Sequence, residues 1–376
     1  MMKAVAVDGS AESVSNEDVL IDTLSEQEQS AIFIFAMRGN WDFLREFLKH
    51  HQYEKMMSNS RRATYEKLNI SFNELKSTNK SAFDLIFKEI KDYAFSILTI
   101  SNKAIYSINL QKKELDDLLK KISSEPQDNA LDIVDRTEDF SSKKNNSCWI
   151  DYDNCKICFF PTVKEANKRT SLDPKKHPGM EGFDSLYGFE LVKNQYIDCL
   201  LLTKDKAFML VDVIDDDSHE YCKQSYDVLL PKIKAEITKH TNVLNISTKD
   251  IFNSIGLICV QNTNPYKKTD YSVHEINFIT PELSRYTAKK SPNKPDIRKD
   301  TFNKDGLKKN IKSLVFYKVS FNIDRIHPVI GFKYKVMVSI PGMYSRAAHG
   351  KGKVDYFLST NFLNMSDFKI IEPLIL

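Results

Sequence analysis

The sequence predicts an α+β protein in which an all-helical front is followed by a larger mixed α+β domain. Two observations support this division. Residues 29–122 contain no proline and a single glycine, Gly39, and their apolar residues recur at helical spacing. From residue 147 the chain carries short stretches rich in Ile, Val, Phe, Tyr and Cys between turn residues, which is the pattern of strands.

The helical front contains one internal breaker. In residues 31–48, Gly39-Asn40 separates two apolar runs that each present one face of a helix. We expect Gly39 to adopt the left-handed conformation that ends a helix, so that two short helices fold back antiparallel. Residues 81–100 repeat the same order of apolar and polar segments without the glycine.

These two stretches resemble the ankyrin repeat. Ser30 to Ala36 stands at its opening, Gly39-Asn40 at its turn and Phe43 to Leu48 at its close, and residues 81–98 form a second copy. The opening Thr-Pro is absent from both copies, and they start 51 residues apart where ankyrin repeats have a period of about 33. The alternative is an unrelated bundle of helical hairpins.

Either arrangement stacks hairpins and leaves an extended side surface, which is typical of protein binding. Trp41 and Tyr93, near the turns, are candidate contact residues, although both also suit packing between helices.

Charge is distributed unevenly. Residues 1–28 hold seven acids against one base and predict a disordered acidic tail. The polar residues 123–146 predict a linker, which leads to the α+β domain at residues 147–376. Residues 285–312 hold ten bases against three acids, which indicates either a solvated basic face or a contact with nucleic acid. The net charge of +3 is too small to imply nucleic acid by itself.

The strand-rich part also contains one well-formed helical pattern, residues 219–240. Its apolar positions recur at spacings of three and four, and Pro231 predicts a kink or a break within it. The chain has no apolar run of about 18 residues, so we expect no membrane span, and we recognise no secretory signal. Six cysteines suit a reducing compartment.

Residues 195–215 predict a strand, a turn at Lys204-Asp205 and a second strand, which would bring Asp198 and Asp212 near each other. With Glu190 upstream, this order resembles the PD-(D/E)XK nuclease superfamily. The resemblance implies that Asp198 and Asp212 bind Mg²⁺, which activates the nucleophile. The lysine of the family motif is missing, and Lys223 is its nearest substitute. A degenerate, nuclease-like binding domain is equally compatible.

Two cysteine-containing pairs have the spacing of zinc ligands: Cys155 with Cys158, and His219 with Cys222. A strand would point the first two thiols to opposite faces, so buried free thiols are the simpler interpretation.

We therefore predict a protein–protein interaction protein. Its composition and degenerate repeat resemble secreted effectors of intracellular bacteria, which implies a role in virulence, a host protein as partner, and the host cytosol or the cytoplasm as its location. The alternative is a metal-dependent nuclease in the C-terminal domain, with the basic side chains of residues 285–312 on phosphates.

Overall fold

A computed structural model describes residues 23–124, 130–134, 136, 148–213, 218–243, 245–260, 270–310 and 312–376. The helices of this part are α1 (Glu26–Arg38), α2 (Trp41–His50), α3 (Arg61–Thr78), α4 (Lys80–Thr99), α5 (Lys112–Ile122), α6 (His219–His240), α7 (Phe252–Cys259), α8 (Thr301–Asn310), α9 (Tyr344–Ala348) and α10 (Met365–Ile375). Its strands are β1 (Lys103–Ile108), β2 (Cys148–Tyr152), β3 (Cys155–Leu172), β4 (Leu186–Leu202), β5 (Ala207–Asp212), β6 (Ser272–Ile279), β7 (Arg285–Lys289), β8 (Val315–Ile326), β9 (Lys333–Pro341) and β10 (Tyr356–Thr360).

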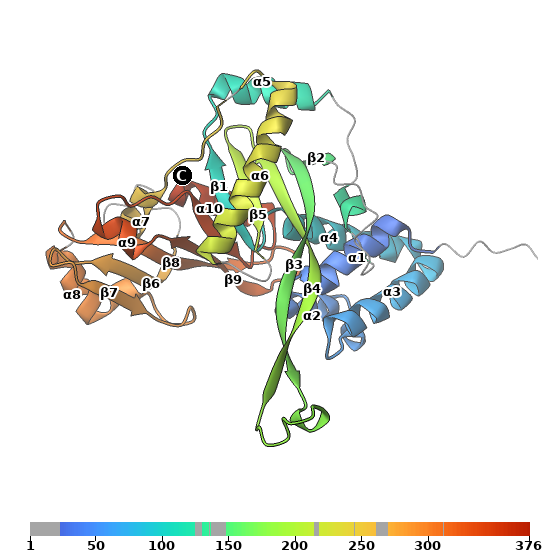
Figure 1. The fold of residues 1–376 in the computed structure, drawn as a ribbon. Coiled ribbons are helices and arrows are strands. Elements are labelled where there is room, and N and C mark those ends of the chain that lie inside the picture. The colour runs from blue at the N-terminus through green and yellow to red at the C-terminus, as the bar shows by residue number, and fades with distance from the viewer. Residues whose placement is uncertain are drawn as a thin grey trace, which may run out of the picture.

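The described strands form one ten-stranded antiparallel sheet in the order β2-β3-β4-β5-β1-β10-β9-β8-β6-β7 (Figure 1). Helices α1–α4 and α10 share one core with one face of the sheet, and α5 and α6 share a second core with the other face. The coarse prediction of an α+β protein is confirmed.

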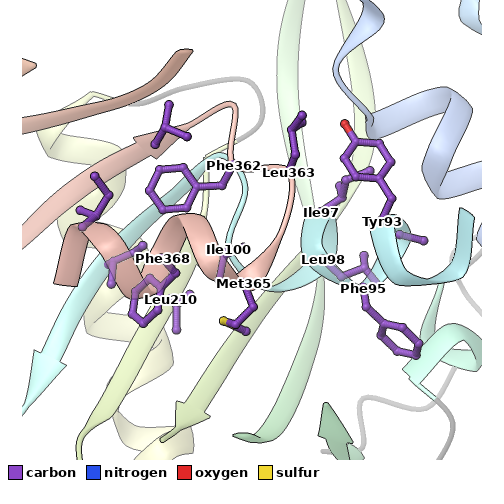
Figure 2. Close-up of a cluster of buried hydrophobic side chains, with 14 of the residues drawn as sticks. Tyr93, Phe95, Ile97, Leu98, Ile100, Leu210, Phe362, Leu363, Met365 and Phe368 are labelled. Carbon is purple, nitrogen blue, oxygen red and sulfur yellow. The ribbon is translucent and has the colours of Figure 1, made fainter. Parts of the chain in front are cut away.

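Strand β1 changes the predicted division into domains. It lies within the front part that was expected to be all helical, yet it pairs with β5 on one side and with β10 on the other. The front helices and the later strands therefore share one hydrophobic core, seen in Figure 2 where residues of α4 meet the segment that leads into α10. The predicted boundary does not separate two independent cores.

The front helix begins earlier than the predicted tail allowed. Ser25 caps α1 by accepting a hydrogen bond from the backbone N–H of Glu28, whose side chain accepts one from the N–H of Ser25 in return. Glu28 therefore belongs to a helix and not to an acidic tail that ends at residue 28. Residues 1–22 of that tail, and most of the predicted linker 123–146, lie outside the described residues.

The break at Gly39-Asn40 is confirmed, but its cause differs from the prediction. Gly39 has an extended conformation, with φ −65° and ψ 162°, and not a left-handed one. A Cβ atom there would lie 2.4 Å from the carbonyl oxygen of Phe35 and 3.1 Å from the ring of Tyr93. Asn40 then starts α2 by accepting the N–H of Phe43 at 2.9 Å. Position 39 requires a glycine because a side chain there has no room, and the Asn40 cap starts the next helix.

The predicted second hairpin does not form, because residues 80–99 make the single continuous helix α4. Helix α1 packs more extensively on α3 and α4 than on α2. The front helices form a layer on the sheet.

Besides α6, the described strand-rich part contains four helices, α7 to α10, that the sequence pattern did not predict. Helix α6 has the expected bounds and continues through Pro231, and its buried face includes Cys222, Leu229 and Ile233. The stretch Ile255 to Cys259 belongs to α7, although its Ile- and Cys-rich composition is that of the stretches predicted as strands. A short apolar run has no periodicity that distinguishes a buried strand from a buried helix.

Candidate functional site

The hairpin of β3 and β4 extends beyond the body of the molecule (Figure 1). The two strands stay paired along their whole length, from the pair Lys156 and Leu202 to the pair Leu172 and Leu186. The neighbouring strands β2 and β5 pair only with the inner part, over residues 155–159 and 199–202. The outer part is therefore a two-stranded ribbon, which we define as residues 163–172 and 186–195.

One face of this ribbon exposes apolar side chains. Tyr187, Phe189 and Leu191 alternate along β4 and so share a face, and Val163 of β3 lies on the same face. Phe189 is 73% exposed and Leu191 is 59% exposed. We call these four residues the ribbon stripe. Near the body, the same face of the sheet is covered by α1–α4.

The base of the ribbon contains the two predicted carboxylates. Both are buried, and they are linked through the backbone: the N–H of Ile197 donates to Asp212 Oδ2 at 2.8 Å, and the N–H of Asp212 donates to Asp198 Oδ1 at 2.8 Å. The prediction that the hairpin brings these residues close is confirmed. However, the register of β4 and β5 and strand alternation place the two side chains on opposite faces of the sheet.

On the α1 side, Asp212 lies between two cations. Arg38 Nη1 is 3.3 Å from Asp212 Oδ2, and Lys103 Nζ is 3.5 Å from Asp212 Oδ1. Lys103 is fully buried and also donates to the carbonyl oxygen of Ile197 at 2.6 Å. A second Arg38 nitrogen donates to the carbonyl of Gln195, the last ribbon residue of β4.

On the α6 side, Lys164 is the corresponding cation. Its Nζ donates to Tyr221 Oη at 2.8 Å and to Ser225 Oγ at 2.9 Å, and it lies 4.7 Å from the ring centre of Tyr196. Burial lowers the pKa of Lys164, while the nearby carboxylates act in the opposite direction. Burial raises the pKa of Asp198, and Lys164 opposes that rise. These contacts fix α6 to the base of the ribbon.

The nuclease arrangement is not assembled. Glu190 is exposed and lies eight residues from Asp198 along one strand, which is about 26 Å at the rise of a strand. Lys223 is exposed on α6. Protein cations instead accompany the two carboxylates, and the described residues contain no group of three or more His, Cys, Asp or Glu side chains that could hold a metal ion. The two carboxylates therefore do not face one shared cation position among the described residues, and the Mg²⁺-dependent nuclease stays a prediction.

Sequence reasoning missed the residues that face these carboxylates: Arg38, Lys103 and Lys164. They come from α1, β1 and β3, so no local spacing links them to the hairpin. The one available signal was Lys103 at the start of the otherwise apolar stretch KAIYSI. A lysine in a fully buried strand requires a hydrogen-bond acceptor or a carboxylate as its partner.

The two cysteines with zinc-ligand spacing do not share a face. All six cysteines are buried, and Cys155 and Cys158 belong to the cores on opposite faces of the sheet. Burial raises the pKa of Cys155 to about 11, which disfavours the thiolate that zinc requires. His219 makes a hydrogen bond to the hydroxyl of Tyr356 at 3.1 Å. The interpretation as buried thiols fits this geometry.

The two predicted contact residues of the front have packing roles. Tyr93 is buried, and its hydroxyl accepts the N–H of Asn40 at 2.9 Å, so it does not belong to the surface. Trp41 is half-buried beside the guanidinium of Arg61, 5.2 Å from the ring centre. Arg61 also donates to the carbonyl of Ala36 at 2.9 Å, which holds this pair against α1.

The basic segment 285–312 forms β7 at one edge of the sheet, followed by α8. Two of its bases serve the fold. Arg298 is buried and donates through Nε to Asp296 at 3.0 Å, and Lys290 pairs with Asp300. The expectation that the segment contacts nucleic acid stays a prediction.

No protein-family model matches the chain, and no curated protein or solved structure shows significant similarity to it. The resemblances to ankyrin repeats, to effectors and to nucleases therefore stay predictions. Among the described residues, no helix is both long enough and apolar enough to cross a membrane.

Proposed function

We propose that the protein acts by binding another protein, and that its partner covers the ribbon stripe. The observation that carries this proposal is the exposure of Phe189 and Leu191 on a ribbon that projects from the body. Contiguous exposed apolar side chains on a soluble protein typically mark an interaction surface. The resemblance to secreted effectors makes a host protein the first partner to seek.

The ribbon is suited to present such a surface. A two-stranded hairpin is marginally stable alone, but here its base is fixed on both faces of the sheet by Arg38 and Lys164. The stripe also alternates with Gly188 and Glu190, which lie on the other face. The most exposed apolar side chains of the paired ribbon therefore lie on one face, along β4.

The preferred surface differs from the helical one that the sequence suggested. Tyr93 is buried and Trp41 is partly covered by Arg61, so these residues offer less apolar area than the stripe does. The two charge clusters at the ribbon base support a structural role for Asp198 and Asp212, so we do not propose a nuclease.

Site-specific photo-crosslinking tests the proposal. A benzophenone amino acid at position 189 should trap a defined partner in cells that contain it, whereas the same probe at position 190, on the opposite face, should not. Phe189→Ser should then abolish capture of that partner by the unmodified chain, and Glu190→Ser should retain it. Equal trapping from both positions, or retained capture by Phe189→Ser, would exclude the stripe as the contact.

A further inference from the structure

A second surface feature lies away from the ribbon. A cavity of about 480 Å³ opens between α2, α4, the turn after β2, the turn between β8 and β9, and the segment before α10. Figure 2 shows part of its inner wall, where Tyr93 of α4 and Leu363 of the later segment lie near each other. This volume falls in the range of small-ligand sites.

Aromatic rings form much of the wall. Phe43 and Tyr93 lie with ring centres 4.4 Å apart, and the His327 ring lies 5.0 Å from Phe43. Tyr152 and Phe47 complete this group. Phe43 and Tyr93 are buried residues, so these walls are rigid. The faces of phenyl and phenol rings carry partial negative charge, which attracts cations.

The charged residues of the lining are all acidic: Glu89, Asp92 and Asp153, without a lysine or an arginine. Asp153 pairs with Lys369 at 2.7 Å, and Glu89 lies 3.3 Å from His51. The Asp92 carboxylate, by contrast, makes no hydrogen bond or ion pair within the described part of the chain. Asp92 is exposed and lines the cavity, so its charge is open to a bound cation.

His327 adds a polar atom inside this wall. Its Nδ1 is buried and has no hydrogen-bond partner among the described residues. Burial lowers the pKa of His327, so the ring stays neutral near pH 7 and adds no positive charge to the cavity. A neutral imidazole offers one nitrogen that accepts a hydrogen bond and one that donates.

We propose that this cavity binds an organic cation, a guanidinium or alkylammonium group on an apolar stem. Aromatic walls and carboxylates together are the chemistry that recognises such groups, because the apolar wall takes the stem and the charge meets Asp92 beside the half-buried ring of Tyr152. An anion would face three carboxylates, and a neutral apolar ligand would gain no charge contact with Asp92. The inference is independent of the ribbon stripe.

Isothermal titration of the full chain with small probes tests this assignment. N-acetyl-arginine amide represents a protein side chain, agmatine, which carries a guanidinium and an ammonium group, represents a free small molecule, and N-acetyl-norleucine amide is the neutral comparison. We expect one or both cations to bind with a Kd of about 0.1–1 mM and the neutral probe not to bind. The relative affinity of the two cations then identifies the source of the group.

Two matched pairs of variants locate the binding. Asp92→Asn should weaken it about fivefold, the value of one exposed charge contact, whereas Asp84→Asn on the same helix but outside the cavity lining should not. Val329→Arg at the mouth should abolish it, and Ile70→Arg on α3 should not. No binding of either cation, equal binding of the neutral probe, or full affinity in both Asp92→Asn and Val329→Arg would overturn the proposal.

Discussion

Replacement of Lys103 by methionine tests whether the buried charges at the ribbon base hold the fold together. Methionine is similar in length to lysine but lacks its charge and its donors. The change removes the 2.6 Å hydrogen bond to the carbonyl of Ile197 and the cation 3.5 Å from Asp212. Both groups would stay buried, because Lys103 pairs within the centre of the sheet.

The expected loss follows from these contacts. Removing one partner of a buried ion pair costs about 3–5 kcal/mol of unfolding free energy, because the other charge stays desolvated. Arg38 is still 3.3 Å from Asp212 and retains part of the compensation, so the lower end of that range applies. We expect Lys103→Met to lower the unfolding free energy by about 3 kcal/mol.

Urea unfolding followed by circular dichroism measures this loss. A double-mutant cycle with Asp212→Asn should give a coupling of about 1–3 kcal/mol, since the two side chains share one network. Lys112→Met is the matched control, because Lys112 pairs with Asp205 at 3.2 Å on the exposed surface. The urea midpoint of this variant should equal that of the unmodified chain. A Lys103→Met midpoint equal to that of the control, or strict additivity in the cycle, would refute the reasoning.

Three other measurements follow from the packing. Gly39→Ala should cost about 1–3 kcal/mol in urea unfolding, because its Cβ would meet the Phe35 carbonyl, while Gly256→Ala, with open space around it, should not destabilise α7. Burial raises the pKa of Asp198 above its ordinary value of 3.8. The protonated carboxyl therefore contributes its full share to the unfolding free energy below pH 3.8, and this share is lost as the pH rises through the raised pKa. Asp198→Asn should flatten that pH dependence, and an unchanged profile would contradict it. A disulfide reagent should label no thiol in the native state, since all six are buried, and rapid labelling of Cys155 would show that β3 opens.

Local patterns in the sequence predicted the elements that depend on nearby residues. The hairpin at Lys204-Asp205 and the amphipathic helix 219–240 each have their whole signal within about 20 residues. The break at Gly39 was also predicted, although from helix-ending geometry instead of the close approach of Phe35 and Tyr93. A glycine looks the same in a sequence whether conformation or space selects it.

Features that depend on distant partners could not be predicted. Strand β1 has six residues, and its partners β5 and β10 lie about 100 and 250 positions away, so nothing local places it in the centre of a sheet. The charges around Asp212 come from α1 and β1 for the same reason. The pairing register determines which face each carboxylate takes, and the sequence does not show that register.

The ribbon combines two kinds of side chain whose roles separate by position. At its base, polar groups such as Arg38 and Asp212 pair with each other, and these contacts contribute to the unfolding free energy of the chain. Farther out, Phe189 and Leu191 are more than half exposed and gain little from folding. Apolar side chains that contribute little to the stability of the free chain gain most when another surface covers them. A rigid base and an uncovered stripe together are what a projecting binding element requires, because the base limits the ordering cost when a partner binds.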